Sequence, residues 1–187
     1  MQKNYLIILL MIALIAYSYQ SNAQVKMNTK VSHTIAAASK EEKLARLIVE
    51  SFRKKDDSLW RSLFPSNEEY RKLLQLMLDA KMEGLTQAKI NDMIAQRKQE
   101  AVKAYNTDFK SFIKQADSLG INWKKTEYKN FIFETYKTAI PGKYLNGDIW
   151  LLYNHIEFVI EGVEAVETSS GFKLQSIKGI RRLEEAD

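Results

Sequence analysis

The stretch DIWLLYNHIEFVIEGVEAVETSSGFKL, residues 148–174, decides the fold. It predicts two antiparallel strands, at 149–153 and 156–166, on either side of a short break. The first is a short apolar run, and apolar and polar residues alternate in the second. The break is Asn154-His155, and asparagine tolerates the left-handed backbone conformation that a two-residue turn requires. The stretch therefore indicates a β-hairpin at the centre of an antiparallel sheet.

The second strand of this hairpin has one apolar side. Ile156, Phe158 and Ile160 lie on that side, and Glu157 and Glu161 lie on the other. Gly162 interrupts the alternation and predicts a β-bulge, after which Val163 returns to the apolar side. A turn containing glycine follows, and we expect a last strand at 172–180.

Three helices are expected before the sheet. Ser39 and Ser66 each begin a capping box, in which a glutamate follows the serine by three residues. Apolar residues recur at helical spacing after both serines, so a helix should begin at each. A third, long helix is predicted from about Thr86 to Leu119, where Gly120 ends the pattern.

This order of elements predicts an α+β fold. We expect three N-terminal helices, within residues 40–119, packed on a four-stranded antiparallel meander sheet within residues 122–182. The first strand should cover residues 123–138, where β-branched and aromatic residues replace the helical spacing. The whole of 39–187 is interpreted as one α+β domain.

The N-terminal residues have the features of an export signal. Lys3 precedes the apolar run Leu6–Ala16, which is shorter than the roughly 20 residues that span a bilayer. Small residues then precede a cut after Ala23, so 1–23 is predicted to be a signal peptide and 24–38 a flexible arm. The expected location is the periplasm or the outside of the cell, and the alternative is an uncleaved N-terminal anchor.

The composition argues against several classes of function. The chain has no cysteine, which excludes disulfides, thiolate metal sites and cysteine nucleophiles. Its net charge is only +5, and positive and negative residues are mixed along the chain, so neither a nucleic-acid partner nor, after signal cleavage, a membrane is expected. Two distant histidines and no phosphate-binding glycine motif leave no metal site and no cofactor predicted.

Three segments carry a resemblance to a known family. They are SSGFKLQSIKGI at 169–180, SLGINWKKTEY at 118–128 and LFPSNEEY at 63–70. With helices followed by a bent antiparallel sheet, the chain resembles the cystatin-like, nuclear-transport-factor-like domains of uncharacterised bacterial secreted proteins. The resemblance implies a sheet wrapped around a conical cavity, where some members hold a catalytic acid or histidine and many only bind. The usual family has a strand between its helices, and none is predicted here.

His155 has two interpretations, a proton-transfer residue or a turn residue. Asp148 lies at the far end of a five-residue strand, about 16 Å away at strand rise. Glu157 is nearer but points along the charged side of its strand. A general base must point into a pocket beside a group that orients it, so the turn is favoured.

Aromatic residues gather in the predicted sheet and at its junction with the helices. Four of them are our candidates for a ligand-binding site: Trp123, Tyr136, Trp150 and Tyr153. The last three are favoured because each has a polar group beside apolar neighbours. They could line an apolar cavity or stack against a sugar. The alternative is that they form the core that a domain without disulfides requires.

The function predicted from these features is a non-catalytic binding module of the cell envelope. Its partner would be a small apolar ligand, a glycan or an envelope protein. The alternative is a cone-fold enzyme, an isomerase or lyase, in which Asp148 or Glu134 is a buried acid and Tyr153 or Tyr136 is the proton donor. A third possibility is a protein partner that docks on the long helix.

Overall fold

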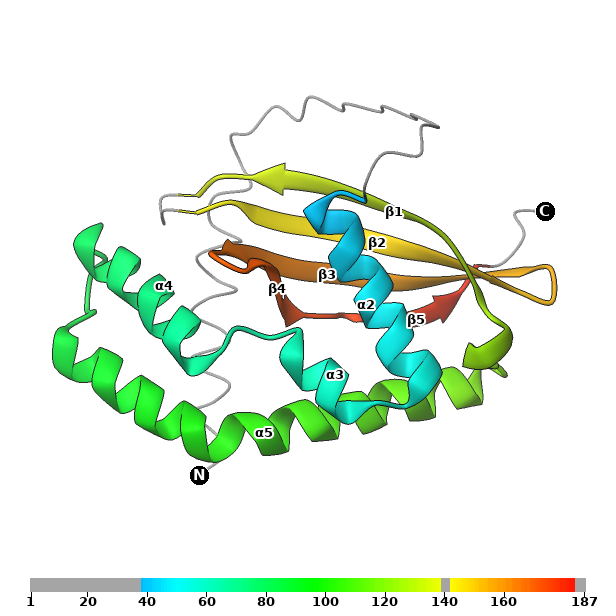
Figure 1. The fold of residues 1–187 in the computed structure, drawn as a ribbon, viewed down its shortest axis with the longest axis horizontal. Helices are drawn as coiled ribbons and strands as arrows, with labels where there is room; N and C mark the ends of the chain where they lie inside the picture. The colour runs from blue at the N-terminus through cyan, green and yellow to red at the C-terminus, as the bar shows by residue number, and fades with distance from the viewer. Residues whose placement is uncertain (1–37, 139–141, 184–187) are drawn as a thin grey trace. The chain divides into compact units, whose positions relative to one another are not determined.

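The computed structural model describes residues 38–138 and 142–183. Within them the chain is α+β, as predicted: helices lie along one face of an antiparallel sheet (Figure 1). The predicted signal peptide, and all of the predicted arm except Ala38, lie outside the described residues. No helix in the described part is both long enough and apolar enough to cross a membrane.

Four helices lie in the described residues, where three were predicted. They are α2 (Lys40–Lys54), α3 (Asp57–Ser62), α4 (Asn67–Asp79) and α5 (Gln87–Ser118). The additional helix is α3, and the carboxylate of Asp56 caps it by accepting a hydrogen bond from the backbone of Leu59. Its six residues are too few to show a helical period, so the sequence pattern did not predict it.

Both predicted serine caps form. At α4 the capping box is complete, since the hydroxyl of Ser66 accepts from the backbone of Glu69 and the carboxylate of Glu69 accepts from the backbone of Ser66. At α2 the hydroxyl of Ser39 accepts from the backbone of Glu42. The Glu42 carboxylate accepts from Arg46 at 2.9 Å.

The Glu69 carboxylate also ties α4 to the sheet. Burial alone would raise its pKa, but hydrogen bonds from Ser170, from the backbone of Ser66 and from Thr168 outweigh burial and lower the pKa to about 2. A carboxyl whose folded-state pKa is depressed stabilises the fold above its unfolded-state pKa and loses that contribution as the pH falls.

We therefore expect the stabilising effect of Glu69 to be fully present at neutral pH and to disappear between about pH 4.5 and pH 2. Glu69→Gln should unfold at lower denaturant concentration than the wild type at neutral pH. The gap between the two proteins should close as the pH falls through this window. Denaturant unfolding across a pH series measures it, and a gap that stays constant or widens in acid would refute the account.

Within the described residues five strands form one antiparallel sheet, where four were predicted. They are β1 (Glu127–Tyr136), β2 (Tyr144–Tyr153), β3 (Ile156–Thr168), β4 (Gly171–Ser176) and β5 (Gly179–Arg182). Strands β1 to β4 pair in chain order as predicted, and β5 pairs with β3 beside β4. The expected last strand at 172–180 is thus two strands, because the chain leaves the ladder at Ile177 and Lys178 and bonds back to Glu161.

The first two strands begin elsewhere than predicted. The expected strand at 123–138 begins with a short 3-10 helix, η1 (Trp123–Lys125), which the side chain of Asn122 caps. The second strand extends five residues further toward the N-terminus than the expected 149–153. Asn146 and Gly147 are poor strand formers, so the sequence pattern did not indicate a strand before Ile149.

The predicted hairpin and bulge are confirmed. Asn154 and His155 have φ angles of 50° and 64°, the positive values of a type I′ turn, and β2 and β3 pair on either side of them. At the bulge, Gly162 has a φ of 60°, and its backbone N–H donates to Oδ1 of Asp148 at 2.8 Å. His155 is exposed in the turn, so it does not enter a pocket.

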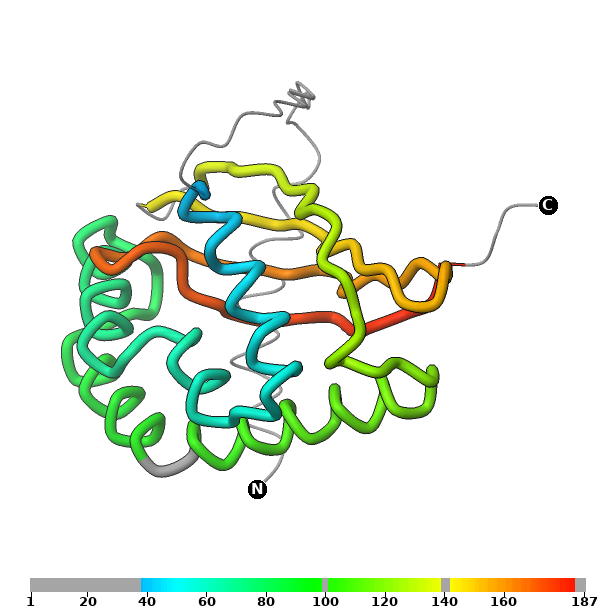
Figure 2. Tube along the Cα trace, turned by 45° about the vertical axis from the view of Figure 1, so that its right-hand side comes forward, coloured from blue at the N-terminus to red at the C-terminus, as the bar shows by residue number. Residues whose placement is uncertain are grey.

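The main core lies between the sheet and the helices. Helix α2 crosses the sheet and contacts β1 and β4, and α5 contacts β5 (Figures 1 and 2). Phe52 of α2 is fully buried, and its ring centroid lies 4.7 Å from that of Trp123 and 5.4 Å from that of Trp60. Ile149, Leu151 and other alternate residues of the strands complete this core.

Candidate functional site

The face of the sheet toward the helices packs against the main core in the described residues. It is filled by aromatic and aliphatic side chains, and the polar side chains buried with them are those of Ser51 and Thr126. Neither is an acid, so the described core holds no buried carboxylate of the kind that the enzyme alternative requires. A ligand site must therefore be sought on a surface.

The four residues predicted to bind a ligand lie on two different faces. Trp123 is 3% exposed within the core, and Tyr153 packs against the same core. Tyr136 and Trp150 point the other way, because each alternates along its strand with residues that face the helices. We call that other side of β1–β5 the outer face.

Strand register arranges the outer face in rows that cross the sheet. The first row is Tyr136, Tyr144, Val166 and Lys173, and the second is Glu134, Asn146, Glu164 and Ser176. Ile132 and Asp148 begin a third row at the bulge, and the fourth is Asn130, Trp150, Val159 and Arg181. Neighbouring rows lie two residues apart along a strand, roughly 7 Å.

The first row presents two stacked phenol rings. Tyr136 and Tyr144 have ring centroids 5.9 Å apart, and the Tyr136 side chain is 38% exposed. Burial raises the pKa of Tyr136, and the carboxylate of Glu164, Tyr144 and the carboxylate of Glu134 raise it further. Burial also raises the pKa of Tyr144. Both hydroxyls therefore stay protonated at neutral pH and can donate hydrogen bonds.

The middle rows form a shallow polar hollow of about 430 Å³, which we call the trough. Among the described residues, its lining contains no large apolar side chain. The lining residues are Asn146, Asp148, Glu161, Gly162, Glu164, Ser176 and Lys178. All three of its carboxylates already have partners. Asp148 accepts from the backbone of Gly162, Glu161 pairs with Arg181, and Glu164 accepts from Ser176 at 2.7 Å. The trough thus offers amide, hydroxyl, ammonium and carboxylate groups between two aromatic rows.

Neither acid of the enzyme alternative is buried, since Asp148 lines the trough and Glu134 is exposed. Asp148 faces outward and accepts from Gly162 at the bulge, whereas Tyr153 faces the helices, so this acid and this tyrosine lie on opposite faces. Glu134 is exposed on the outer face, one row from Tyr136. The described residues also contain no group of three or more histidine, cysteine or acidic side chains that could hold a metal ion.

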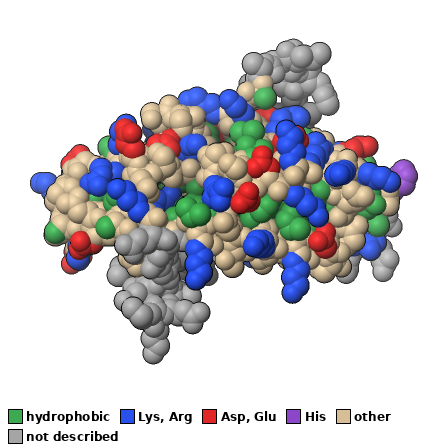
Figure 3. Space-filling view, turned by 60° about the horizontal axis from the view of Figure 1, so that its bottom comes forward, with side chains coloured by type: hydrophobic (Ala, Val, Ile, Leu, Met, Phe, Trp, Pro, Cys, Tyr) green, Lys and Arg blue, Asp and Glu red, His purple; other side chains and the backbone are tan. Residues whose placement is uncertain are grey.

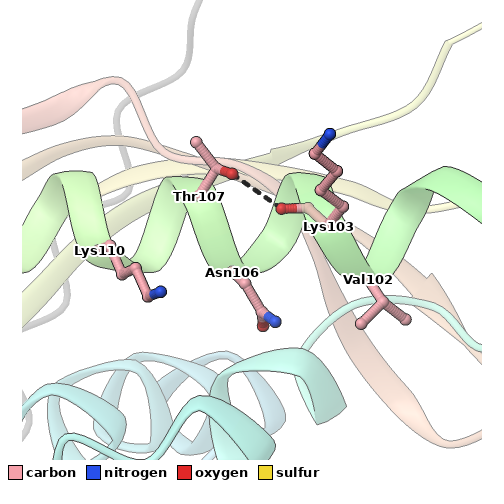
Figure 4. A pocket seen from close by; sticks show the side chains of 5 residues that line it. All are labelled: Val102, Lys103, Asn106, Thr107 and Lys110. Carbon is pink, nitrogen blue, oxygen red and sulfur yellow. Dashed lines mark hydrogen bonds between the residues drawn. The ribbon is translucent and has the colours of Figure 1, made fainter.

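A second hollow lies on α5, away from the sheet. Figure 4 shows its lining residues on that helix: Val102, Lys103, Asn106, Thr107 and Lys110. The hydroxyl of Thr107 donates to the carbonyl of Lys103 one turn earlier, which is an ordinary bond within a helix. Figure 3 shows this side of the molecule, where lysine and arginine side chains are scattered among small hydrophobic areas. We assign no site to it.

Sequence analysis missed Tyr144, Asn146 and Glu164 as members of a site. The sequence did contain a signal for this face. Every second residue of β2 from Tyr144 to Trp150 is aromatic or polar, namely Tyr144, Asn146, Asp148 and Trp150. The residues between them face the core or pack closely on β1. Because the predicted strand began only at Ile149, the alternation of the earlier residues was not used. With β2 beginning at Tyr144, the alternation places these side chains on the outer face.

The fold and this face define an α+β protein with an antiparallel sheet covered by helices on one side and bearing a polar trough between aromatic rows on the other. Comparison with protein-family models, with curated proteins and with solved structures finds no match. The resemblance to cystatin-like, nuclear-transport-factor-like domains stays a prediction.

Proposed function

We propose that the protein is an exported, non-catalytic binding module of the cell envelope, and that it binds a glycan on the outer face of its sheet. The observation that carries the proposal is the trough between the Tyr136–Tyr144 pair and Trp150. A sugar chain has apolar C–H faces that stack on aromatic rings and hydroxyl groups that bond to polar side chains. Tyrosine and tryptophan suit both kinds of contact.

The polarity of the trough favours a glycan over an apolar ligand. Sites for apolar small molecules are lined mainly by hydrophobic side chains with few polar groups. Among the described residues the trough has the reverse composition, and aromatic side chains lie at its two ends. Along β2, Tyr144 and Trp150 are six residues apart, about 20 Å at strand rise, which suits an extended ligand better than a compact one.

Export is the part of the proposal that rests on the sequence. The apolar run Leu6–Ala16 after Lys3, and the small residues before Ala23, support a signal peptide. A protein outside the cytoplasm meets polysaccharides of its own envelope and of its surroundings. A glycan is therefore a ligand that such a protein encounters.

Tyr136→Ala is expected to weaken glycan binding at least tenfold, or about 1.4 kcal/mol, because it removes an exposed aromatic anchor. The matched control is Phe133→Ala. Phe133 lies on the same strand and is also 38% exposed, but it points to the helix side. Calorimetric titration with soluble oligomers of glucose, N-acetylglucosamine and mannose measures the affinities.

The control should bind within about twofold of the wild type, since its change lies on the other face. Equal losses in the two variants would show that the strand, and not the outer face, matters. If the wild-type protein binds none of the three oligomers, the glycan proposal is wrong.

A further inference from the structure

The two edges of the sheet differ in how their backbone is protected. On the β4–β5 edge, the backbone N–H of Leu174 donates to the carbonyl of Leu63 at 2.8 Å, and that of Ile180 donates to Gln115. This edge is also interrupted, because β4 ends at Ser176 and β5 begins at Gly179. These are the features with which proteins prevent an edge strand from pairing with another chain.

The β1 edge lacks such protection in the described residues. Its ten residues, Glu127–Tyr136, pair on one side with β2, and no backbone hydrogen bond of the described chain reaches its other side. One irregularity interrupts the pairing, between Tyr128 and Asn130, and the rest of the strand is regular. The N–H and C=O groups on that side, which have no backbone partner among the described residues, can accept another strand.

Exposed hydrophobic side chains concentrate on this strand. Five large hydrophobic residues are exposed in the described chain, and three of them belong to β1: Ile132, Phe133 and Tyr136. Ile132 is the most exposed of the five, at 55%. It lies on the outer face, and its neighbour Phe133 lies on the opposite face. Both faces of the edge are therefore apolar at its centre.

We propose that β1 pairs antiparallel with β1 of a second copy of this chain, around a two-fold axis through Ile132. Directly opposite residues of an antiparallel pair share a face. In this register Ile132 meets Ile132, Phe131 meets Phe133, and Asn130 meets Glu134. Each apolar residue thus meets an apolar residue, and the Asn130 amide can donate to the Glu134 carboxylate twice, once on each side of the axis.

The other symmetric registers are poorer. An axis through Phe133 sets Ile132 against Glu134, and an axis through Glu134 sets two carboxylates against each other. An axis through Phe131 sets the charged Lys129 against Phe133. Like charges opposite each other, and charges opposite apolar residues, destabilise a strand pair, so the sequence favours the Ile132-centred register.

The dimer should be in exchange with the monomer. Stable interfaces bury about 1,200–2,000 Å² in total, and one pair of short edge strands buries less. A two-fold axis at the strand centre closes the assembly at two copies, because each copy has one free β1 edge and a protected β4–β5 edge. The result is a single sheet continued across both copies, with the two outer faces side by side. Pairing of the two β1 strands does not require a bound ligand.

Because the chain has no cysteine, a single introduced cysteine can test the proposed pairing by disulfide cross-linking. Ile132→Cys places one thiol opposite its copy, with Cβ atoms about 4.5–5.5 Å apart, close to the roughly 3.5–4.5 Å of a disulfide. Under mild oxidation this variant should form a covalent dimer on a non-reducing gel. The control is Val102→Cys, because Val102 is 52% exposed on α5 and lies away from β1.

Two further cysteine variants test the register. Asn130→Cys and Glu134→Cys should each cross-link little alone and should cross-link readily when mixed. If Ile132→Cys cross-links no faster than Val102→Cys, or if Asn130→Cys alone cross-links as fast as the mixture, the proposed pairing is wrong.

Sedimentation of cysteine-free protein gives an independent test. The mass of the wild-type protein should rise toward twice that of one chain as its concentration increases. Ile132→Lys should abolish the rise by setting two ammonium groups against each other, and Val102→Lys should leave it unchanged. Thermal melts that match the wild type show that the variants fold. A wild-type protein that stays monomeric throughout, or a rise that Ile132→Lys leaves intact, would overturn the proposal.

Discussion

Phe52→Ala is expected to lower the free energy of unfolding by about 3–5 kcal/mol, the usual range for an aromatic side chain removed from a core. Phe52 is fully buried, and its ring contacts those of Trp60, Phe109 and Trp123 at centroid distances of 4.7 to 5.6 Å. These neighbours come from three separate helical elements, α3, α5 and η1. A cavity at this point cannot close without moving all three.

Denaturant unfolding measures the effect, and Leu76→Ala is the control. Leu76 is also a large hydrophobic residue in a helix, but it is 41% exposed. Its loss should change the free energy of unfolding by no more than about 0.5 kcal/mol. If Phe52→Ala destabilises no more than Leu76→Ala does, the described core is wrong.

Gly147→Ala is the substitution with the second-largest expected effect, a loss of about 1–3 kcal/mol from overpacking. A Cβ atom at Gly147 would lie 2.5 Å from the backbone oxygen of Ile132 and 2.6 Å from Cβ of Phe133. The first of these atoms belongs to the backbone of the paired strand, so relief requires β1 to move away from β2. The effect is steric, and it acts at the strand that carries Tyr136.

Gly179→Ala is the matched control for this glycine. Gly179 also lies in a strand, but the nearest atom to an added Cβ is Nε2 of Gln115 at 3.5 Å, an ordinary contact. Thermal unfolding should therefore show a clear drop for Gly147→Ala and little change for Gly179→Ala. Equal stability of the two variants would mean that β1 and β2 do not approach each other as described.

The elements that sequence predicted are those defined by local chemistry. Asn154-His155 can adopt positive φ, Gly162 can form a bulge, and Ser39 and Ser66 can cap helices, so each specifies its structure with a few neighbouring residues. What the sequence did not reveal depends on residues far along the chain. The last strand divides because Lys178 bonds to Glu161, and that contact has no local signature.

The candidate site was predicted only in part, because the face on which a residue lies also depends on residues far along the chain. Tyr136 and Trp150 were singled out, and both lie on the outer face. The segment of Trp123 was expected to be a strand, but it forms η1, and its ring stacks against that of Phe52. Tyr153 lies three positions after Trp150, an odd offset that places it on the opposite, helix side of the sheet. Face assignment required the pairing, which sequence alone did not supply.

The most direct test of the glycan proposal is to follow the indole N–H signals by nuclear magnetic resonance while an oligosaccharide that binds is added. The chain has three tryptophans, and two of them, Trp60 and Trp123, are buried at 1% and 3% exposure. Only the signal of Trp150, at the end of the trough, is predicted to shift with saturation. A shift confined to Trp60 or Trp123, or no shift of Trp150 at a saturating concentration, would contradict binding on the outer face.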